Sequence, residues 1–143
     1  MVQRQNRKLT SSEKEKIVKI LSGLIESRDD ILFAYIFGSF ASKDSFGDID
    51  LGIFVKEESV PSRLKLELKL EEELQTAVHV PTDVKVLNSA HLTFVYNVLK
   101  SGFVIVDKDK SLRADFEGLI CKKYFDFSYL RKEYLREITH APV

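Results

Sequence analysis

A glycine–serine pair between two apolar runs restricts the fold more than any other part of this sequence. The first run spans residues 31–37, is apolar at every position and ends at Gly38-Ser39. After eight further residues, Asp48-Ile49-Asp50 opens a second apolar run that reaches Val55. Strand side chains alternate between two faces, so Asp48 and Asp50 share one face, with Cα atoms about 6.5–7 Å apart. We therefore predict two strands, with a pair of carboxylates at the start of the second.

The residue types at this junction indicate a site for a metal and a phosphate. Gly38 has no Cβ, so its backbone can approach an anion closely, and Ser39 adds a hydroxyl beside it. The carboxylates of Asp48 and Asp50 repel each other unless a divalent cation, here Mg²⁺, lies between them and a phosphate. The alternative interpretation is a solvated turn with a chance pair of acidic residues.

The Gly-Ser pair, the short gap and the Asp-x-Asp segment resemble the signature of the nucleotidyltransferase superfamily that includes DNA polymerase β. From about Thr10 to its C-terminus, the chain is similar to the smallest branch, the minimal nucleotidyltransferase (MNT) domains that act as antitoxins to HEPN-type partners. The similarity also involves the segments 82–88, 99–107, 115–117 and 124–127. It implies an α+β fold in which a small mixed β-sheet has helices packed on one side and the active site on its open face.

The resemblance assigns roles to five residues. Asp48, Asp50 and Asp83 are the implied catalytic residues and ligands of one or two Mg²⁺ ions, and Asp83 is either a metal ligand or the base for the attacking hydroxyl. Gly38 and Ser39 are the implied nucleotide-binding residues. A turn aspartate after a proline is the alternative interpretation of Asp83.

The implied reaction is transfer of AMP from ATP to a tyrosine hydroxyl of a HEPN-type toxin, which the antitoxin silences. In a chain of this size, few residues remain to form an acceptor pocket beyond those that form the triphosphate site. This also favours a separate acceptor protein. Two other functions stay open. One is adenylyl transfer to a small molecule such as an aminoglycoside. The other is an antitoxin that binds without turnover, since the loop before Asp48 is shorter than the family usually has and carries Ser42-Lys43 where Arg-Gly is usual.

Composition limits the remaining classes. We expect residues 1–143 to form one domain, with residues 1–9 as a flexible polar tail. Lys and Arg number 22, as do Asp and Glu, so net charge gives no reason to expect a nucleic-acid or membrane partner. The single Cys121 fits a reducing compartment, and no apolar run is long enough to cross a membrane, so we expect a cytoplasmic protein. A homodimer and a hetero-oligomer both remain open.

The rest of the chain predicts helices and short strands. Thr10 with Glu13, or Ser12 with Glu15, predicts a capping box for a helix ending near residues 28–30. Pro61 suits the first turn of a helix reaching Ala77. We further expect a strand over 82–87, a helix over 90–100 capped by Ser89, a strand over 103–106, and helix over 112–138 with a break near 126–128. Aromatic residues crowd into 116–134 and predict a docking surface with a basic rim. Phe40 and Phe46, beside the loop, either stack on a base or pack on the protein.

Overall fold

A mixed four-stranded sheet forms the centre of the computed structural model, which describes residues 7–42 and 45–140. Its strand order is β5–β4–β2–β6, where β2 is antiparallel to β4 and β6, and β4 is parallel to β5. The bounds are Ile31–Phe37 (β2), Ile49–Val55 (β4), Thr82–Val86 (β5) and Phe103–Asp107 (β6). Arg7–Lys8 (β1) pair with Ser45–Phe46 (β3), so part of the expected tail is a strand, whereas residues 1–6 of that tail lie outside the described residues.

The first helix begins at the first of the two capping boxes that the sequence allows. Helix α1 spans Ser11–Glu26, and its capping box is present. The Glu13 amide donates to Thr10 Oγ1 (3.1 Å), and the Thr10 amide donates to Glu13 Oε1 (3.2 Å). These two bonds satisfy backbone donors that a helix N-terminus otherwise leaves unpaired.

The leucine-rich segment after Pro61 is a helix, as expected. A 3-10 helix, η1 (Glu57–Ser62), contains the proline and leads into α3 (Arg63–Val78). Leu66, Leu70 and Leu74 are buried, while Leu64 and Leu68 are exposed. The buried residues recur every four positions, which is helical spacing, so the strand-like alternation of leucines in the sequence is accidental.

The predictions for the last two helices were wrong in detail. Ser89 does not cap a helix, because it belongs to a 3-10 turn, η2 (Leu87–Ser89), and α4 (Leu92–Ser101) begins three residues later, after His91. Gly102 does end α4, and its amide donates to the Val98 carbonyl (2.8 Å). Helix α5 runs unbroken from Lys110 to His140, so the break expected near residues 126–128 is absent. That stretch holds neither Gly nor Pro, the residues that most often interrupt a helix.

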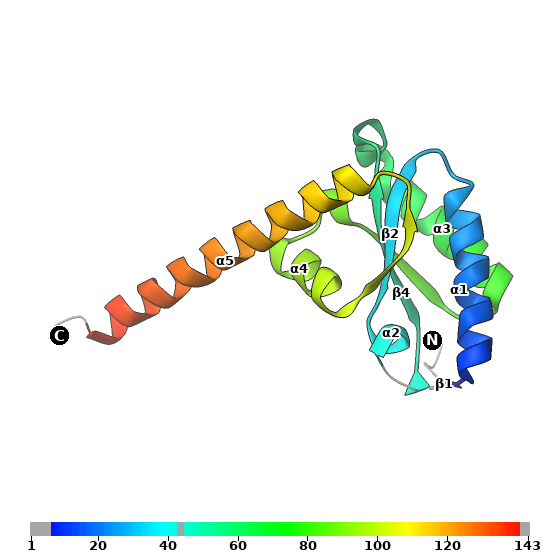
Figure 1. Cartoon of the computed structure of the whole chain (residues 1–143), viewed down its shortest axis with the longest axis horizontal. Helices are drawn as coiled ribbons and strands as arrows, with labels where there is room; N and C mark the ends of the chain where they lie inside the picture. Colours follow the sequence, from blue (N-terminus) through cyan, green and yellow to red (C-terminus); the bar gives the residue numbers. More distant parts are fainter. Residues whose placement is uncertain (1–6, 43–44, 141–143) are drawn as a thin grey trace.

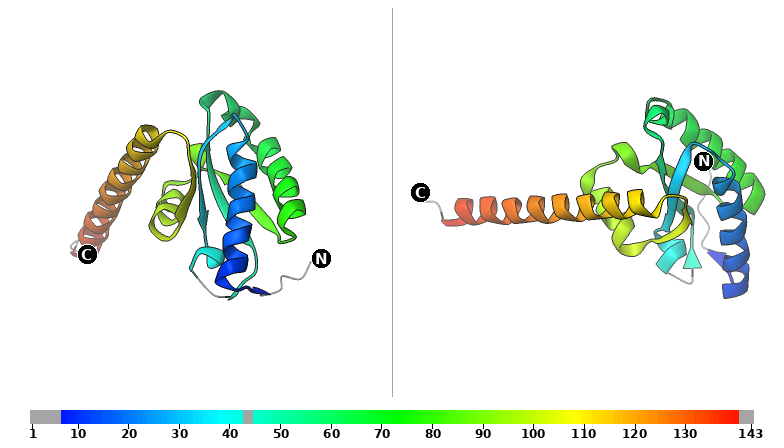
Figure 2. Two further views of the ribbon diagram at one scale, coloured as in Figure 1. Left: turned by 45° about the vertical axis from the view of Figure 1, so that its right-hand side comes forward. Right: turned by 45° about the horizontal axis from the view of Figure 1, so that its top comes forward.

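The helices cover the two faces of the sheet unequally (Figures 1 and 2). Helices α1 and α3 pack on one face and enclose the larger buried cluster, to which β4 contributes Ile49, Leu51, Ile53 and Val55. On the other face, α4 and the start of α5 cover Phe33 and Tyr35. The α+β class and mixed sheet are thus confirmed. The open part of the second face is smaller than expected, and it lies at the end where Asp50 is found.

Helix α5 is fixed to the sheet at its start and then projects from the domain (Figure 1). Tyr35 donates its hydroxyl hydrogen to Glu117 (2.6 Å), and Arg113 donates to both Glu117 (2.7 Å) and Asp107 (2.9 Å). Burial, together with Glu117, raises the pKa of Tyr35 above its usual range, which keeps this donor protonated. In the described part of the chain, no helix, α5 included, has the length and apolarity needed to cross a membrane.

Candidate active site

Strand β4 places Asp50 on the less covered face of the sheet. Its alternate residues Ile49, Leu51 and Ile53 are fully buried against α1 and α3, which leaves Asp50 pointing the other way. Asp48 lies in a bend directly before the strand, and both aspartates are half-buried. The apolar positions of the strand therefore decide on which face Asp50 lies.

Strand β5 brings Asp83 beside Asp50. The two strands are parallel, and Asp50 and Asp83 are register partners. Neighbouring strands lie about 4.8 Å apart, and register partners project from the same face. Thr82, Val84 and Val86 are buried, which leaves Asp83 exposed on the face of Asp50. Two aspartates far apart in the sequence thus meet on one surface.

Gly38 lies directly against the Asp50 carboxylate. It follows β2, which pairs with β4 so that Phe37 is opposite Asp50, and its φ is 76°. A Cβ on Gly38 would overlap Asp50 Oδ2 and lie 3.2 Å from its Cγ. Only glycine fits both this backbone angle and this approach. Ser39, the next residue, is half-buried and begins the short helix α2 (Ser39–Ser42).

The structure therefore aligns the expected site residues across three adjacent strands. Gly38 and Ser39 follow β2, Asp48 directly precedes β4, Asp50 lies on β4, and Asp83 lies on β5. Phe40 does not take part, because its side chain is buried in the core under α1, and the Lys14 Nζ lies 5.1 Å from its ring centre. Residues 43–44 and the side chain of Phe46 lie outside the described residues.

The donor set suits a hard divalent cation. Mg²⁺ is usually held by one or two carboxylates, with water and substrate phosphates completing its octahedron, rather than by an all-protein cage. Across residues 7–42 and 45–140, no three or more His, Cys, Asp or Glu side chains are grouped closely enough to hold a metal. The aligned aspartates fit the first arrangement, in which a nucleotide supplies the missing ligands.

Glu71 of α3 adds negative charge beside Asp83. Its Oε1 accepts the amide hydrogen of Val84 (3.0 Å), and Glu67 Oε2 accepts that of Val86 (2.8 Å), so α3 covers the open edge of β5. Burial and, less strongly, the neighbouring Asp83 raise the pKa of Glu71, against the lowering effect of the Val84 amide. A cation held by Asp83 would oppose this rise, because it offsets the repulsion between the two carboxylates.

We predict that the wild-type protein loses stability as the pH rises because Glu71 ionises, and that Glu71→Gln abolishes this loss. Since the pKa of Glu71 is higher in the folded than in the unfolded state, its contribution to stability is full below its unfolded pKa and is lost as pH rises through the folded pKa. Glutamine can still accept the Val84 hydrogen bond without repelling Asp83. Thermal melts from pH 4 to 8 should show a higher Tm for the variant at pH 7 and no advantage at pH 4. Glu72→Gln, an exposed neighbour on α3, is the control and should follow wild type.

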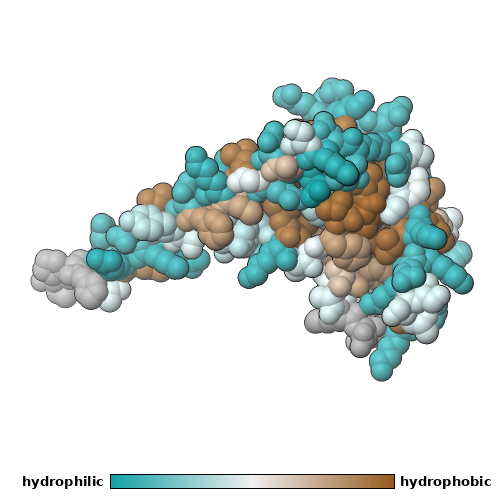
Figure 3. Space-filling model, viewed as in Figure 1, coloured by the Kyte–Doolittle hydropathy of each residue, from teal (hydrophilic) through white to brown (hydrophobic). Residues whose placement is uncertain are grey.

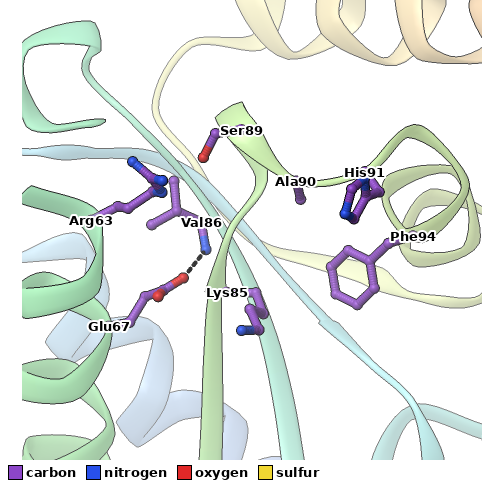
Figure 4. Close-up of a pocket in the computed structure, with 8 residues that line it drawn as sticks. All are labelled: Arg63, Glu67, Lys85, Val86, Ser89, Ala90, His91 and Phe94. Atoms are coloured by element: carbon purple, nitrogen blue, oxygen red, sulfur yellow. Dashed lines mark hydrogen bonds between the residues drawn. The ribbon is translucent and has the colours of Figure 1, made fainter. Parts of the chain in front are cut away.

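A pocket of about 300 Å³ lies along β5 after Asp83, where Lys85 and Val86 line it (Figure 4). Lys85, two residues after Asp83 and on the same strand face, lies between the start of α3 and the start of α4. Among the described residues Lys85 forms no ion pair. Sequence reasoning missed this pocket, whose other lining residues include Arg63, Glu67, Ser89, His91 and Phe94. They come from three separate segments, and no motif marks them.

The family model for "Polymerase beta, Nucleotidyltransferase" matches residues 15–111, which is more than half of the chain. Among curated proteins no significant match is found. The matched segment runs from α1 through β6 and contains every site residue described above.

Several solved structures share the fold. One is the tri-AMPylated HEPN toxin of Shewanella oneidensis in complex with MNT antitoxin, with 17% identity, a TM-score of 0.60, and coverage of 92% of this chain and 99% of the other. A toxin–antitoxin structure with AMP-PNP gives 15% identity, a TM-score of 0.61, and coverage of 92% and 99%. The toxin–antitoxin structure MntA–HepT gives 18% identity, a TM-score of 0.61, and coverage of 91% of this chain and 99% of the other. At these identities the likeness establishes the fold.

Proposed function

The chain belongs to the polymerase beta nucleotidyltransferase family, and we propose that it transfers AMP from Mg-ATP to a tyrosine hydroxyl of a HEPN-type toxin, as an antitoxin. One observation carries the chemistry: Asp50 and Asp83 are register partners on one sheet face, and Gly38 lies against Asp50. Structures with the same fold support the partner, since they include an AMPylated HEPN toxin with its MNT antitoxin and a toxin–antitoxin structure with AMP-PNP.

Each site residue has a defined task in this proposal. Asp48 and Asp50 would hold Mg²⁺, which neutralises phosphate charge when bound. The Gly38 backbone and the Ser39 hydroxyl contact the terminal phosphates. Asp83 accepts the proton of the attacking hydroxyl. The acceptor oxygen bonds to the α-phosphorus, the bond from that phosphorus to the bridging oxygen breaks, and pyrophosphate leaves.

Helix α5 favours a protein as the acceptor. Leu112, Phe116 and Ile120 pack against the domain. At 3.6 residues per turn, the same stripe continues through Phe127, Leu130, Tyr134 and Ile138, which are 50%, 65%, 63% and 55% exposed. Figure 3 shows apolar side chains spaced along the projecting helix. The projecting part of α5 has only marginal stability in water when nothing packs against it, and a protein partner would cover its apolar stripe.

The overall function is tested by following label from ATP. The protein is incubated with Mg²⁺, host lysate and ATP labelled on the α-phosphate, and the γ-labelled nucleotide serves as the control. We expect label from the first nucleotide in a polypeptide and none from the second. A labelled small molecule would support an aminoglycoside-type transferase instead. Absence of any label, together with tight toxin binding, would support a binding antitoxin without turnover.

We predict that the double substitution Phe127→Ser and Tyr134→Ser weakens partner binding at least tenfold and leaves the Tm within about 2 °C of wild type. Both residues are exposed on the stripe, so little folding energy is lost, while the partner loses two apolar contacts. Tyr129→Ser is the control: Tyr129 is as exposed as Tyr134, at 64% against 63%, but lies on the opposite side of the helix. A lowered Tm with unchanged binding would mean that the stripe serves the fold and that the partner docks elsewhere.

A further inference from the structure

The positions of the site residues across strands β2, β4 and β5 indicate from which side of Asp50 the acceptor approaches. In an in-line transfer, the attacking oxygen enters opposite the leaving group. Under the proposed function, pyrophosphate leaves toward Gly38 and Ser39, which follow β2. The acceptor hydroxyl must then come from the other side of Asp50, past Asp83, where β5 is the edge strand of the sheet.

The pocket of Figure 4 lies on this acceptor side. Lys85 of β5 lines the pocket, and it lies two residues after Asp83 on the same face of the strand. Phe94 forms part of its wall and packs edge-on against Phe37 (5.5 Å between ring centres), the residue that precedes Gly38. The pocket is therefore joined to the phosphate-binding end of the site by direct packing.

The charges at the pocket favour an anionic ligand. Arg63 and Lys85 are both exposed at it and supply two cations. The one carboxylate in the lining, Glu67, is buried and accepts the Val86 amide hydrogen (2.8 Å), and it forms no ion pair with either cation. Arginine and lysine placed this way suit carboxylates, and the Phe94 and His91 rings offer a flat wall beside them.

We propose that this pocket binds an acidic segment of the acceptor protein, in which glutamate or aspartate side chains flank the tyrosine that receives AMP. The inference rests on the proposed function and names the chemistry of its substrate. Acidic side chains pair with Arg63 and Lys85, and this pairing places the neighbouring tyrosine hydroxyl beside Asp83. Nucleotide binding, in contrast, depends on Gly38, Ser39 and Asp50 and does not use the two cations.

The experiment combines Arg63→Glu with Lys85→Glu and uses two probes. The control is Lys65→Glu with Lys69→Glu, which reverses the same amount of charge at exposed positions of α3 outside the pocket lining. The first probe is a fluorescent peptide, Glu-Glu-Tyr-Glu-Glu, whose anisotropy reports binding, compared with Lys-Lys-Tyr-Lys-Lys. The second is the Tm shift caused by Mg-ATP.

We expect the acidic peptide to bind wild type and the control, to bind the pocket variant at least tenfold more weakly, and to outcompete the lysine peptide. The Mg-ATP shift should be the same in all three proteins. Equal binding of the acidic peptide to all three, or no binding to wild type, would overturn the proposal. So would loss of the Mg-ATP shift in the pocket variant alone, which would assign the pocket to the nucleotide. A wild-type protein without any Mg-ATP shift would instead contradict the proposed function itself.

Discussion

Asp50→Asn is expected to lower AMP transfer by on the order of 10³-fold and to abolish the Tm shift caused by Mg-ATP. Asp50 is the central residue of the site, with Gly38 against its carboxylate on one side and Asp83 in register on the other. An amide has one oxygen and no charge, so it holds Mg²⁺ far less well than a carboxylate. Transfer from α-labelled ATP and thermal melts measure the two effects.

The same substitution should leave the fold intact. Asp50 and Asp83 repel each other when no cation is bound, so removal of one charge keeps or raises the free energy of unfolding. Asp29→Asn, an exposed aspartate in the turn before β2, is the matched control and should behave as wild type in both assays. An Asp50 variant that keeps a full Mg-ATP shift would contradict the assignment of the metal site.

Gly38→Ala is expected to lower the free energy of unfolding by about 1–3 kcal/mol and also to remove the Mg-ATP shift. Two costs combine at this position. A φ of 76° is strained for any residue with a Cβ, and that Cβ would overlap the Asp50 carboxylate. The carboxylate must then turn away from the place where it would hold the metal. Chemical denaturation and nucleotide-dependent melts separate the two losses.

Gly23→Ala is the matched control for Gly38→Ala. Gly23 lies inside α1, and a Cβ there would meet no atom within 4 Å. Alanine is the better helix former, so this variant should gain about 0.5–1 kcal/mol of stability and keep the full Mg-ATP shift. If both glycine variants lost the shift, its loss in Gly38→Ala would reflect a general effect of substitution and not the contact with Asp50.

The strands and helices could be predicted where the signal is carried by neighbouring residues. The capping box at Thr10, the apolar strand over residues 31–37 and the end of α4 at Gly102 are all found. Each depends on spacing within a few residues, and local propensity and side-chain alternation decide such features. The errors arose where local signals were weak, at Ser89 and at residues 126–128, because tertiary packing and simple continuation of the helix decided the outcome there.

The sequence by itself determined the residue types of the candidate site: a glycine without a Cβ, a hydroxyl beside it, and a pair of carboxylates where a strand with buried alternate residues begins. Only the tertiary structure decided that Asp83 lies in register with Asp50 and that Glu71 adds charge beside it. It also decided that Arg63, Lys85 and Phe94, from three separate segments, line one pocket. The physical reason is that alternation and propensity act between near neighbours in the chain, whereas strand pairing and helix packing join segments that no local pattern relates.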